Sequence, residues 1–368
     1  MHCVYFLVSI AVMVVLHLFI GRFASLRSRV NWRFAADVAG VTALTLSLAG
    51  FLLFVLRKET AAAFMAVAFG LYAGSFGLPA IWLWKVVRGS VRSLFVVIGA
   101  SFLLLLGLYG LLIEPNRLTV REEVISFSQW SQGGSPVRLV HISDLQSVGF
   151  CEREAEAAEM INSLDPDVIV FTGDYIAGPF NDIGPAVEAA RRFLFALKAR
   201  YGVFTVAGHS ENDVIRRQIF EGIPHVHYLR DEAASLDVGE GRTLRIYGLD
   251  LDESWHEHLN VENVADRVTP QTVSVFASHV PDISPALDGH GVDLHVAGHT
   301  HGGQVVIPGI GPLVTLSKLP RHHSRGLFLY GDHWLNVCAG IGMEGNHAPR
   351  IRLFCPPEIC LILLEGGE

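Results

Sequence analysis

The sequence predicts an α/β fold of two packed β-sheets with helices outside, an α/β/β/α sandwich, that follows four transmembrane helices. Three observations lead to this prediction. Four long apolar segments occupy the first third of the chain. Short apolar runs typical of strands then alternate with amphipathic helical patterns. The last part is rich in strand patterns and poor in helical ones, which indicates a second sheet.

The four apolar segments contain no Asp, Glu, Lys or Arg and are roughly 18–25 residues long, enough for a helix to cross a bilayer. They are Cys3–Ile20, Val38–Leu56, Thr60–Trp84 and Ser93–Ile113. A cleaved signal peptide is the weaker interpretation of the first, which lacks a basic start and a clear cleavage site. The sequence thus divides into a transmembrane region (1–113), a connector with one strand (114–136) and an α/β domain (137–368).

Charge supports this division. The chain has 368 residues, of which 51% are hydrophobic and only 17% charged, against about 25% charged in soluble domains. Residues 1–113 hold nine Lys and Arg and two Asp and Glu, a net charge of +7, whereas residues 114–368 hold 19 and 34, a net charge of −15. An acidic domain repels phosphate backbones, so we do not expect a nucleic acid partner.

The basic residues also predict an orientation. Loops 21–37 and 85–92 carry seven of them, and the positive-inside rule places these loops in the cytoplasm. Four crossings then put the α/β domain outside the cytoplasm, as part of a multi-pass protein of the cell membrane. Because the spans hold no Asp, Glu, Lys or Arg, we expect an anchor and not a transporter.

The α/β domain is expected to begin with alternating strands and helices, because its apolar runs are short and bounded by Gly, Asp or Ser. The predicted strands are Val137–Ile142, Val168–Thr172, Val203–Ala207, Leu244–Tyr247 and Val273–Ala277, and the predicted helices are Glu152–Leu164 and Pro185–Arg200. Pro185 suits a first helical turn. The second set of strands is Gln304–Ile307, Gly326–Tyr330, His333–Cys338 and Glu358–Leu364.

Five polar clusters each follow a predicted apolar strand. They are Ser143-Asp144-Leu145-Gln146, Gly173-Asp174-Tyr175, Gly208-His209-Ser210-Glu211-Asn212, Ser278-His279 and Gly298-His299-Thr300-His301-Gly302-Gly303. Loops at the carboxyl ends of strands form the sites of α/β folds. Carboxylates and imidazoles together are ligands for divalent metals, and glycines let the backbone approach a bound ion.

The ordered set D-x-[H/Q], G-D, G-[N/H], H, G-H-T-H-G-G-Q resembles the calcineurin-like metallophosphoesterases, and is most similar to their branch with membrane-anchored domains. The resemblance covers about residues 137–365. The segment GHTHGGQVVIPGIG is very specific, and the tail APRIRLFCPPEICLILL is similar to that branch too.

The resemblance implies two divalent metal ions, drawn from Mn, Zn, Fe and Mg, and a metal-bound hydroxide that attacks phosphorus in line. Residue by residue, Asp174 matches the carboxylate that bridges the two ions. Asp144, Gln146 and His301 complete the first metal site, and His209, His279 and His299 complete the second. Asp174, His209 and Ser210 occupy the positions of the family's catalytic residues.

Three residues depart from the family pattern. Gln146 stands where His is usual, as in the manganese-dependent ADP-ribose and CDP-alcohol diphosphatases that this variant resembles. His209-Ser210 replaces Asn-His, and Ala177 replaces an acidic residue. The first site then has three oxygens and one nitrogen and the second the reverse, which predicts a mixed pair of a tightly held nitrogen-bound metal and a labile Mn or Mg.

Ser210 cannot supply the positive charge of the usual His. We therefore expect slow turnover, or a charge from the substrate or a nearby side chain, with His322, His323 and Arg325 as candidates. Asn346, His347 and His323 are weak candidates for substrate contacts.

Several of these residues have simpler interpretations. Asp144 and Asp174 would then cap turns, and His279 would be a hydrogen-bonded core residue. His299 and His301 would be a structural pair, and Gln146 and His209 non-ligands in a decayed site. His256 and His258 are expected in a surface loop. Among five cysteines we expect buried thiols, with a Cys355–Cys360 disulfide as the alternative.

The expected function is therefore a membrane-anchored metal-dependent phosphoesterase acting on a phosphodiester, diphosphate or phosphomonoester. The anchor favours a lipid-linked substrate. The alternative is a non-catalytic metal-binding sensor or binding module with a degenerate site, which the changes at Gln146, His209 and Ser210 support.

Overall fold

The computed structural model describes residues 94–177, 182–250, 269–344 and 350–367. It divides into two compact units, of which the second includes everything from Leu106 onward. The first three predicted spans lie outside the described residues. So do all the basic residues that orient them, the histidines at 256 and 258, and the candidates Asn346 and His347.

The fourth predicted span is a helix. Helix α5 (Leu94–Leu108) continues into a turn of π-helix (Tyr109–Ile113) and one of 3₁₀-helix (Glu114–Asn116). Within the described residues, Ile98–Asn116 is long and apolar enough to cross a membrane. The structure thus supports one span of the four by length and composition.

The first sheet has six strands in the order β1-β14-β2-β3-β4-β5. Its strands are β1 (Thr119–Phe127), β2 (Val137–Ile142), β3 (Val168–Phe171), β4 (Val203–Thr205), β5 (Val226–Tyr228) and β14 (Glu358–Gly366). Strands β2 to β5 are parallel, so their carboxyl ends meet at one edge. Strand β14 lies between β1, to which it is parallel, and β2, to which it is antiparallel.

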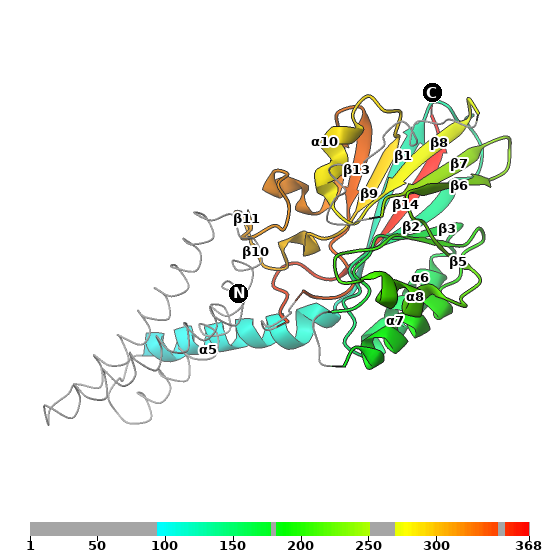
Figure 1. Cartoon of the computed structure of the whole chain (residues 1–368). Helices are drawn as coiled ribbons and strands as arrows, with labels where there is room; N and C mark the ends of the chain where they lie inside the picture. The colour runs from blue at the N-terminus through cyan, green and yellow to red at the C-terminus, as the bar shows by residue number, and fades with distance from the viewer. Residues whose placement is uncertain (1–93, 178–181, 251–268, 345–349, 368) are drawn as a thin grey trace, which may run out of the picture. The chain divides into compact units, whose positions relative to one another are not determined.

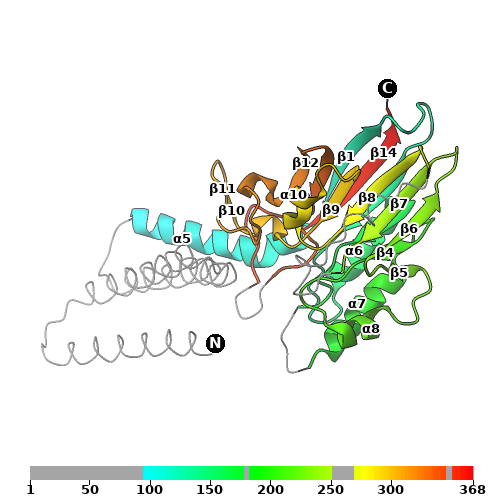
Figure 2. The ribbon, with the colours of Figure 1, turned by 45° about the horizontal axis from the view of Figure 1, so that its top comes forward.

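The second sheet has six strands in the order β12-β13-β9-β8-β7-β6. Its strands are β6 (Glu232–Asp237), β7 (Thr243–Gly248), β8 (Thr272–Ala277), β9 (Leu294–Ala297), β12 (Gly326–Tyr330) and β13 (His333–Val337). Strands β7, β8, β9 and β13 are parallel. A small hairpin, β10 (Val306–Ile307) and β11 (Gly311–Pro312), lies apart from both large sheets (Figures 1 and 2).

Buried side chains alternate along the strands between the two faces of each sheet, and one face of each sheet packs against the other sheet. Leu139 and Val170 of the first sheet meet Ile246 and Val275 of the second in one core. Their neighbours along the strands, such as Val140 and Ile169, point the other way and pack under helices. This period of two is the strand geometry that buries both faces of a sheet.

Helices cover the outer faces of both sheets (Figure 1). Helices α6 (Glu152–Ser163), α7 (Gly184–Ala196) and α8 (Asp213–Phe220) lie on the first sheet. Helix α10 (Ser284–Leu287) lies on the second, where Ile283 and Leu287 pack on Phe276. The predicted two-sheet α/β sandwich with helices outside is therefore confirmed for the described residues. Pro185 is in the first turn of α7, as predicted.

The stretch 114–136, predicted as a connector with one strand, is part of the packed domain. Strand β1 pairs with β14 along its whole length. The buried Trp130 donates a hydrogen bond from Nε1 to Gln271 O at 2.9 Å, next to the second sheet.

Candidate metal centre

The seven predicted metal ligands all follow strands that end at one edge of the sandwich. Asp144 and Gln146 follow β2, Asp174 follows β3 and His209 follows β4, all in the first sheet; His279 follows β8, and His299 and His301 follow β9, in the second. The structure brings these side chains together, and both sheets contribute to the cluster.

The backbone at this edge is strained. Asp144, Gln146, Asp174, His299 and His301 all have positive φ, between 46° and 67°. Residues other than glycine avoid this left-handed region, at a cost of about 1–3 kcal/mol each. Such strain persists where the surrounding structure over-determines the conformation, and it concentrates at functional sites.

Two glycines make room for the carboxylates. A Cβ atom at Gly208 would lie 2.2 Å from Asp174 Oδ1, and one at Gly298 would lie 2.4 Å from Asp144 Oδ2. Any other residue would push the carboxylates out of place. The glycines of the G-H and G-H-T-H motifs therefore serve close approach.

The ligand atoms have the spacing of atoms that share a metal ion. His279 Nε2 lies 3.4 Å from Asp174 Oδ2, and His301 Nε2 lies 3.4 Å from Asp144 Oδ1. Both distances exceed those of hydrogen bonds. Bonds of ~2.0–2.1 Å to a tetrahedral metal would separate two ligands by about 3.4 Å.

Three buried polar atoms at the centre have no hydrogen-bond partner: Asp144 Oδ1, His279 Nε2 and His301 Nδ1. An unpaired buried polar atom costs about 1–3 kcal/mol, so unpaired atoms on residues that cluster together call for a ligand. The donor set of carboxylates and imidazoles is the one that divalent metals select. The residues present therefore fit a metal centre.

The described residues contain overlapping groups whose ligand atoms lie within 4.8 Å of one another. His209, His279 and His299 form one group, Asp144, Asp174 and His279 a second, and Asp174, His301 and Glu344 a third. Asp174 belongs to two of them, as a bridging carboxylate would. The three imidazole rings of the first group lie 4.8–5.2 Å apart, centroid to centroid.

Charge is unevenly distributed over these groups. Burial would lower the pKa of His279, but the neighbouring Asp174 carboxylate outweighs it and raises the pKa to about 10. Burial would raise the pKa of Asp174, but the charge of His279 holds it well below its usual range. Burial, with Asp174 nearby, raises the pKa of Asp144 to about 7. A proton on His279 thus sits among carboxylates, where a metal ion would supply the positive charge instead.

Glu344 was not identified from the sequence. Its Oε2 accepts a hydrogen bond from Gln146 Nε2 at 3.2 Å, and its main chain exchanges two hydrogen bonds of 2.9 Å with the Gln304 side chain. Glu344 follows β13, beside β9, so it reaches the same edge of the sheets. It lies in an irregular segment without a metal-binding motif. The one sequence signal near it was its closeness along the chain to the candidates Asn346 and His347.

The Gln146 side chain faces the carboxylates. Its Nε2 donates to Asp174 Oδ2 at 2.8 Å as well as to Glu344. Half a turn of the amide would present Oε1 at the same place. With its amide turned, Gln146 could therefore be a metal ligand. In the orientation described, its Nε2 instead donates to both carboxylates, those of Asp174 and Glu344.

Supporting contacts hold the ligand loops. Buried Glu211 accepts hydrogen bonds from Tyr175 N at 2.7 Å and Gly208 N at 3.1 Å, which joins the loops of Asp174 and His209. His279 Nδ1 donates to Thr172 O at 2.7 Å, which directs its Nε2 at the centre. Such outer contacts orient metal ligands. Ser210 contributes its backbone N–H, which donates to Asp174 Oδ1 at 3.1 Å.

The three side chains proposed to replace the charge missing at Ser210 are engaged elsewhere. Arg325 pairs with the buried carboxylate of Glu358. His322 and His323 lie in a short 3₁₀-helix and pack on Phe328.

The cysteines of the described residues are free. Cys355 and Cys360 are buried thiols, as expected, so the alternative of a disulfide between them is wrong.

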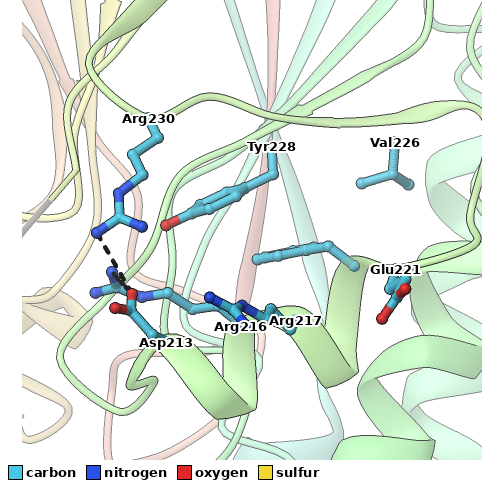
Figure 3. A pocket seen from close by; sticks show the side chains of 8 residues that line it. Asp213, Arg216, Arg217, Glu221, Val226, Tyr228 and Arg230 are labelled. Carbon is cyan, nitrogen blue, oxygen red and sulfur yellow. Dashed lines mark hydrogen bonds and ion pairs between the residues drawn. The ribbon is translucent and has the colours of Figure 1, made fainter.

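A separate hollow of about 380 Å³ lies between α8 and β5 (Figure 3), and none of the predicted ligands lines it. Two of its three arginines are paired: Arg216 lies 3.0 Å from Asp250, and Arg230 lies 2.7 Å from Asp250 and 3.4 Å from Asp213. Figure 3 shows Arg230 facing Asp213 across its rim. The residues suited to metal-dependent chemistry therefore lie not in this hollow but in the cluster of predicted ligands at the ends of the strands.

Comparisons with known proteins agree with this geometry. Residues 137–303 match the family model of the calcineurin-like phosphoesterases. The chain is 26% identical over 286 residues to the metallophosphoesterase YkuE of Bacillus subtilis, covering 76% of this chain and 97% of the relative.

Two further relatives have more specific names. One is the UDP-2,3-diacylglucosamine pyrophosphatase LpxG of Chlamydia trachomatis, 25% identical over 302 residues, or 68% of this chain and 90% of the relative. The other is a transmembrane protein with a metallophosphoesterase domain of Danio rerio, 25% identical over 304 residues, or 76% of this chain and 64% of the relative.

Fold, site and relatives together define a metal-dependent phosphoric ester hydrolase. Residues 137–303, from the start of β2 to the glycines after His301, are similar to the calcineurin-like phosphoesterases, whose family model they match.

Proposed function

We propose that this protein is a membrane-anchored phosphoesterase with a dinuclear metal centre, which hydrolyses a phosphodiester or diphosphate of a lipid-linked substrate. The observation that carries the proposal is the convergence of carboxylates and imidazoles from two sheets on buried atoms that lack partners.

Each ligand has a role in this proposal. Asp174 would contribute to both metal sites, Asp144, Gln146 and His301 would hold the first ion with Glu344 nearby, and His209, His279 and His299 would hold the second. When bound, the ions would supply Lewis acidity and a water of lowered pKa. His209 is the exposed member of its group, so the phosphoryl group enters from its side.

The lipid-linked substrate is supported by two observations. The described helix from Ile98 to Asn116 can cross a membrane and ends three residues before β1. The relative LpxG is named for the cleavage of a diphosphate that carries acyl chains. A multi-pass anchor with the domain outside the cytoplasm follows from the charges of the predicted loops.

Hydrolysis of bis-p-nitrophenyl phosphate by the full chain in detergent, with Mn²⁺, tests the proposal. We expect release of p-nitrophenol that stops when a chelator removes the metal. A folded, metal-loaded protein without activity under Mn, Zn, Fe or Mg would contradict the proposal and favour a metal-binding sensor.

Metal analysis after dialysis checks the mixed pair. The group of three histidines offers nitrogen, whereas Asp144, Gln146 and Glu344 offer oxygen around Asp174 and His301. We expect about one tightly held zinc or iron per chain, and a second site that loses its ion and is refilled by Mn²⁺ or Mg²⁺. Two equally retained ions of one kind would contradict this prediction.

We propose that Arg350 supplies the charge missing at Ser210. Its Nη2 donates to Gln146 O at 2.6 Å, while its buried Nε and Nη1 have no hydrogen-bond partner among the described residues. Burial and the nearby Arg153 lower its pKa to about 10, so it stays charged at neutral pH. A planar guanidinium with free donors is suited to phosphoryl oxygens.

Replacement of Arg350 by Met should lower kcat/KM for bis-p-nitrophenyl phosphate about 10²-fold, the usual effect of losing one donor to a developing charge. Ser210→His should raise the rate in the parent and restore part of it in the Arg350→Met background. A purely structural arginine would not be rescued by a charge at position 210, so absence of rescue would contradict this role.

A further inference from the structure

Five large apolar side chains near the metal centre are exposed. Leu112 is 58% exposed, Ile113 56%, Ile307 37%, Ile310 73% and Phe354 46%. We call them the apolar rim. Single exposed apolar residues are common, but connected groups mark contact surfaces.

Hydrogen bonds connect the segments that carry the apolar rim. Arg352 N donates to Gly110 O at 3.0 Å, which ties the strand-like segment before Phe354 to the end of the apolar helix. A Cβ atom at Gly110 would lie 2.9 Å from Arg352 O, so only glycine permits this approach. Val306 N donates to Leu353 O at 2.9 Å, which ties the β10–β11 hairpin to the same segment. The three segments that carry the apolar rim are therefore joined to one another by backbone hydrogen bonds.

Phe354 has a conformation that sequence preferences oppose. Its φ is +54° although it is bulky and half exposed, which costs about 1–3 kcal/mol. Its ring lies 6.3 Å from that of Tyr109, centroid to centroid. The hydroxyl of Tyr109 accepts a hydrogen bond from Arg117 Nη1 at 3.2 Å. Aromatic rings followed by an arginine at a helix end are typical of the level of lipid headgroups.

The β10–β11 hairpin has the composition of a membrane-contacting loop. Residues 302–317 contain no Asp, Glu, Lys or Arg, and the tip presents Ile307 and Ile310 on either side of Pro308 and Gly309. An exposed loop that faced only water would gain solubility from charge. The hairpin follows His301 directly, so the same loop carries a metal ligand and the apolar tip.

We propose that the apolar rim inserts into the headgroup region of a lipid bilayer and holds the metal centre at the level of lipid phosphates. The bilayer is the occupant because the rim begins on the helix from Ile98 to Asn116, whose length and composition suit a span. Whatever is hydrogen-bonded to the end of a span lies at the membrane surface. The substrate's phosphate would then reach the centre while its acyl chains stay in the membrane, a step that rests on the proposed function.

Depth measurement tests the insertion without reference to activity. The full chain, with Cys3 and Cys151 changed to Ser, receives Ile310→Cys and a fluorescent label in phosphatidylethanolamine–phosphatidylglycerol vesicles that contain spin-labelled lipid. We expect strong quenching and a blue-shifted emission. Phe195→Cys is the matched control, since Phe195 is 67% exposed near the end of α7, at the opposite ends of the strands from the metal centre.

Equal quenching of the two labels would overturn the proposal. So would an Ile310→Asp variant that changes the oligomeric state of the detergent-solubilised chain, because the rim would then be an interface between proteins.

Activity tests the consequence. Ile310→Asp should lower hydrolysis of phosphatidyl-p-nitrophenol in vesicles about tenfold, the factor for ~1.4 kcal/mol of lost apolar burial, and leave bis-p-nitrophenyl phosphate unaffected. Phe195→Asp should change neither rate. An equal loss on both substrates would contradict the rim's role in substrate delivery. Quenching without hydrolysis of either substrate would leave the rim in place and refute the proposed function instead.

Discussion

Asp174→Asn should reduce hydrolysis of bis-p-nitrophenyl phosphate by at least about 10³-fold, a loss of ~4 kcal/mol of transition-state stabilisation. The substitution keeps the shape of the side chain but removes the charge shared by two groups of ligands. Asp174 Oδ2 accepts a hydrogen bond from Gln146 Nε2 at 2.8 Å. In the Asn variant an amide NH₂ group can take the place of this oxygen, so that two donors would face each other. The measurement is the steady-state rate at saturating Mn²⁺, together with the metal content.

Asp165→Asn is the control for this variant. Asp165 also has a positive φ, 48°, but its side chain is exposed. It lies just before β3, at the opposite end of that strand from Asp174. Asn accepts the left-handed region readily, so both variants should keep the fold and only the one at Asp174 should lose activity. A folded Asp174→Asn protein with more than a tenth of the parent rate would refute the bridging role.

Arg352→Met should destabilise the α/β domain by about 3–5 kcal/mol, because several buried carbonyl oxygens would lose their donor, at about 1–3 kcal/mol each. The guanidinium is fully buried. It donates to Ala339 O at 2.7 Å, to Gly342 O at 2.6 Å and to Cys355 O at 3.1 Å, and lies 3.4 Å from His301 O. Among the described residues no carboxylate forms an ion pair with it, so the carbonyl oxygens around it are the acceptors of its hydrogen bonds.

Thermal unfolding of the full chain in detergent measures the effect. For a domain of this size each 1 kcal/mol lowers Tm by about 2–4 °C, so a fall of at least about 6 °C is expected. Arg352→Lys keeps the charge but loses the planar set of donors and should fall in between. Arg200→Met, at an exposed arginine with one long ion pair to Asp167, should leave Tm nearly unchanged. A Tm unaltered by Arg352→Met would show that other donors satisfy the carbonyls.

Much of the fold could be predicted because hydrophobic periodicity is strong in its central strands. Strand β2 has the predicted bounds, and β3, β7 and β8 differ by one or two residues. Strands β5 and β9 were missed because they have only three and four residues and are interrupted by His227 and His295. Strand β6, with the sequence EAASLD, lies at a sheet edge where pairing with β7 overrides a low strand propensity.

Those residues of the candidate site that directly follow a strand and belong to a recognisable motif could be predicted from the sequence. Asp144, Asp174 and the histidines after β9 are of this kind. Glu344, Arg350 and Arg352 were not, because irregular segments bring them to the centre. Backbone hydrogen bonds such as Gln304 to Glu344 determine those paths, and no local sequence period encodes them.

The position of β14 has a consequence for the synthesis of the protein. This strand is the last in the chain order, yet it lies inside the first sheet, between β1 and β2. A chain emerging from the ribosome can therefore pair β2 with β3 and β4 early, but β1 has no neighbour until Glu358–Gly366 has emerged. Domains generally fold as units, so this one closes only after β14 has been made. The candidate ligands after β8 and β9 also follow those after β2, β3 and β4 in the chain, so the candidate metal centre is complete only when most of the domain has been made.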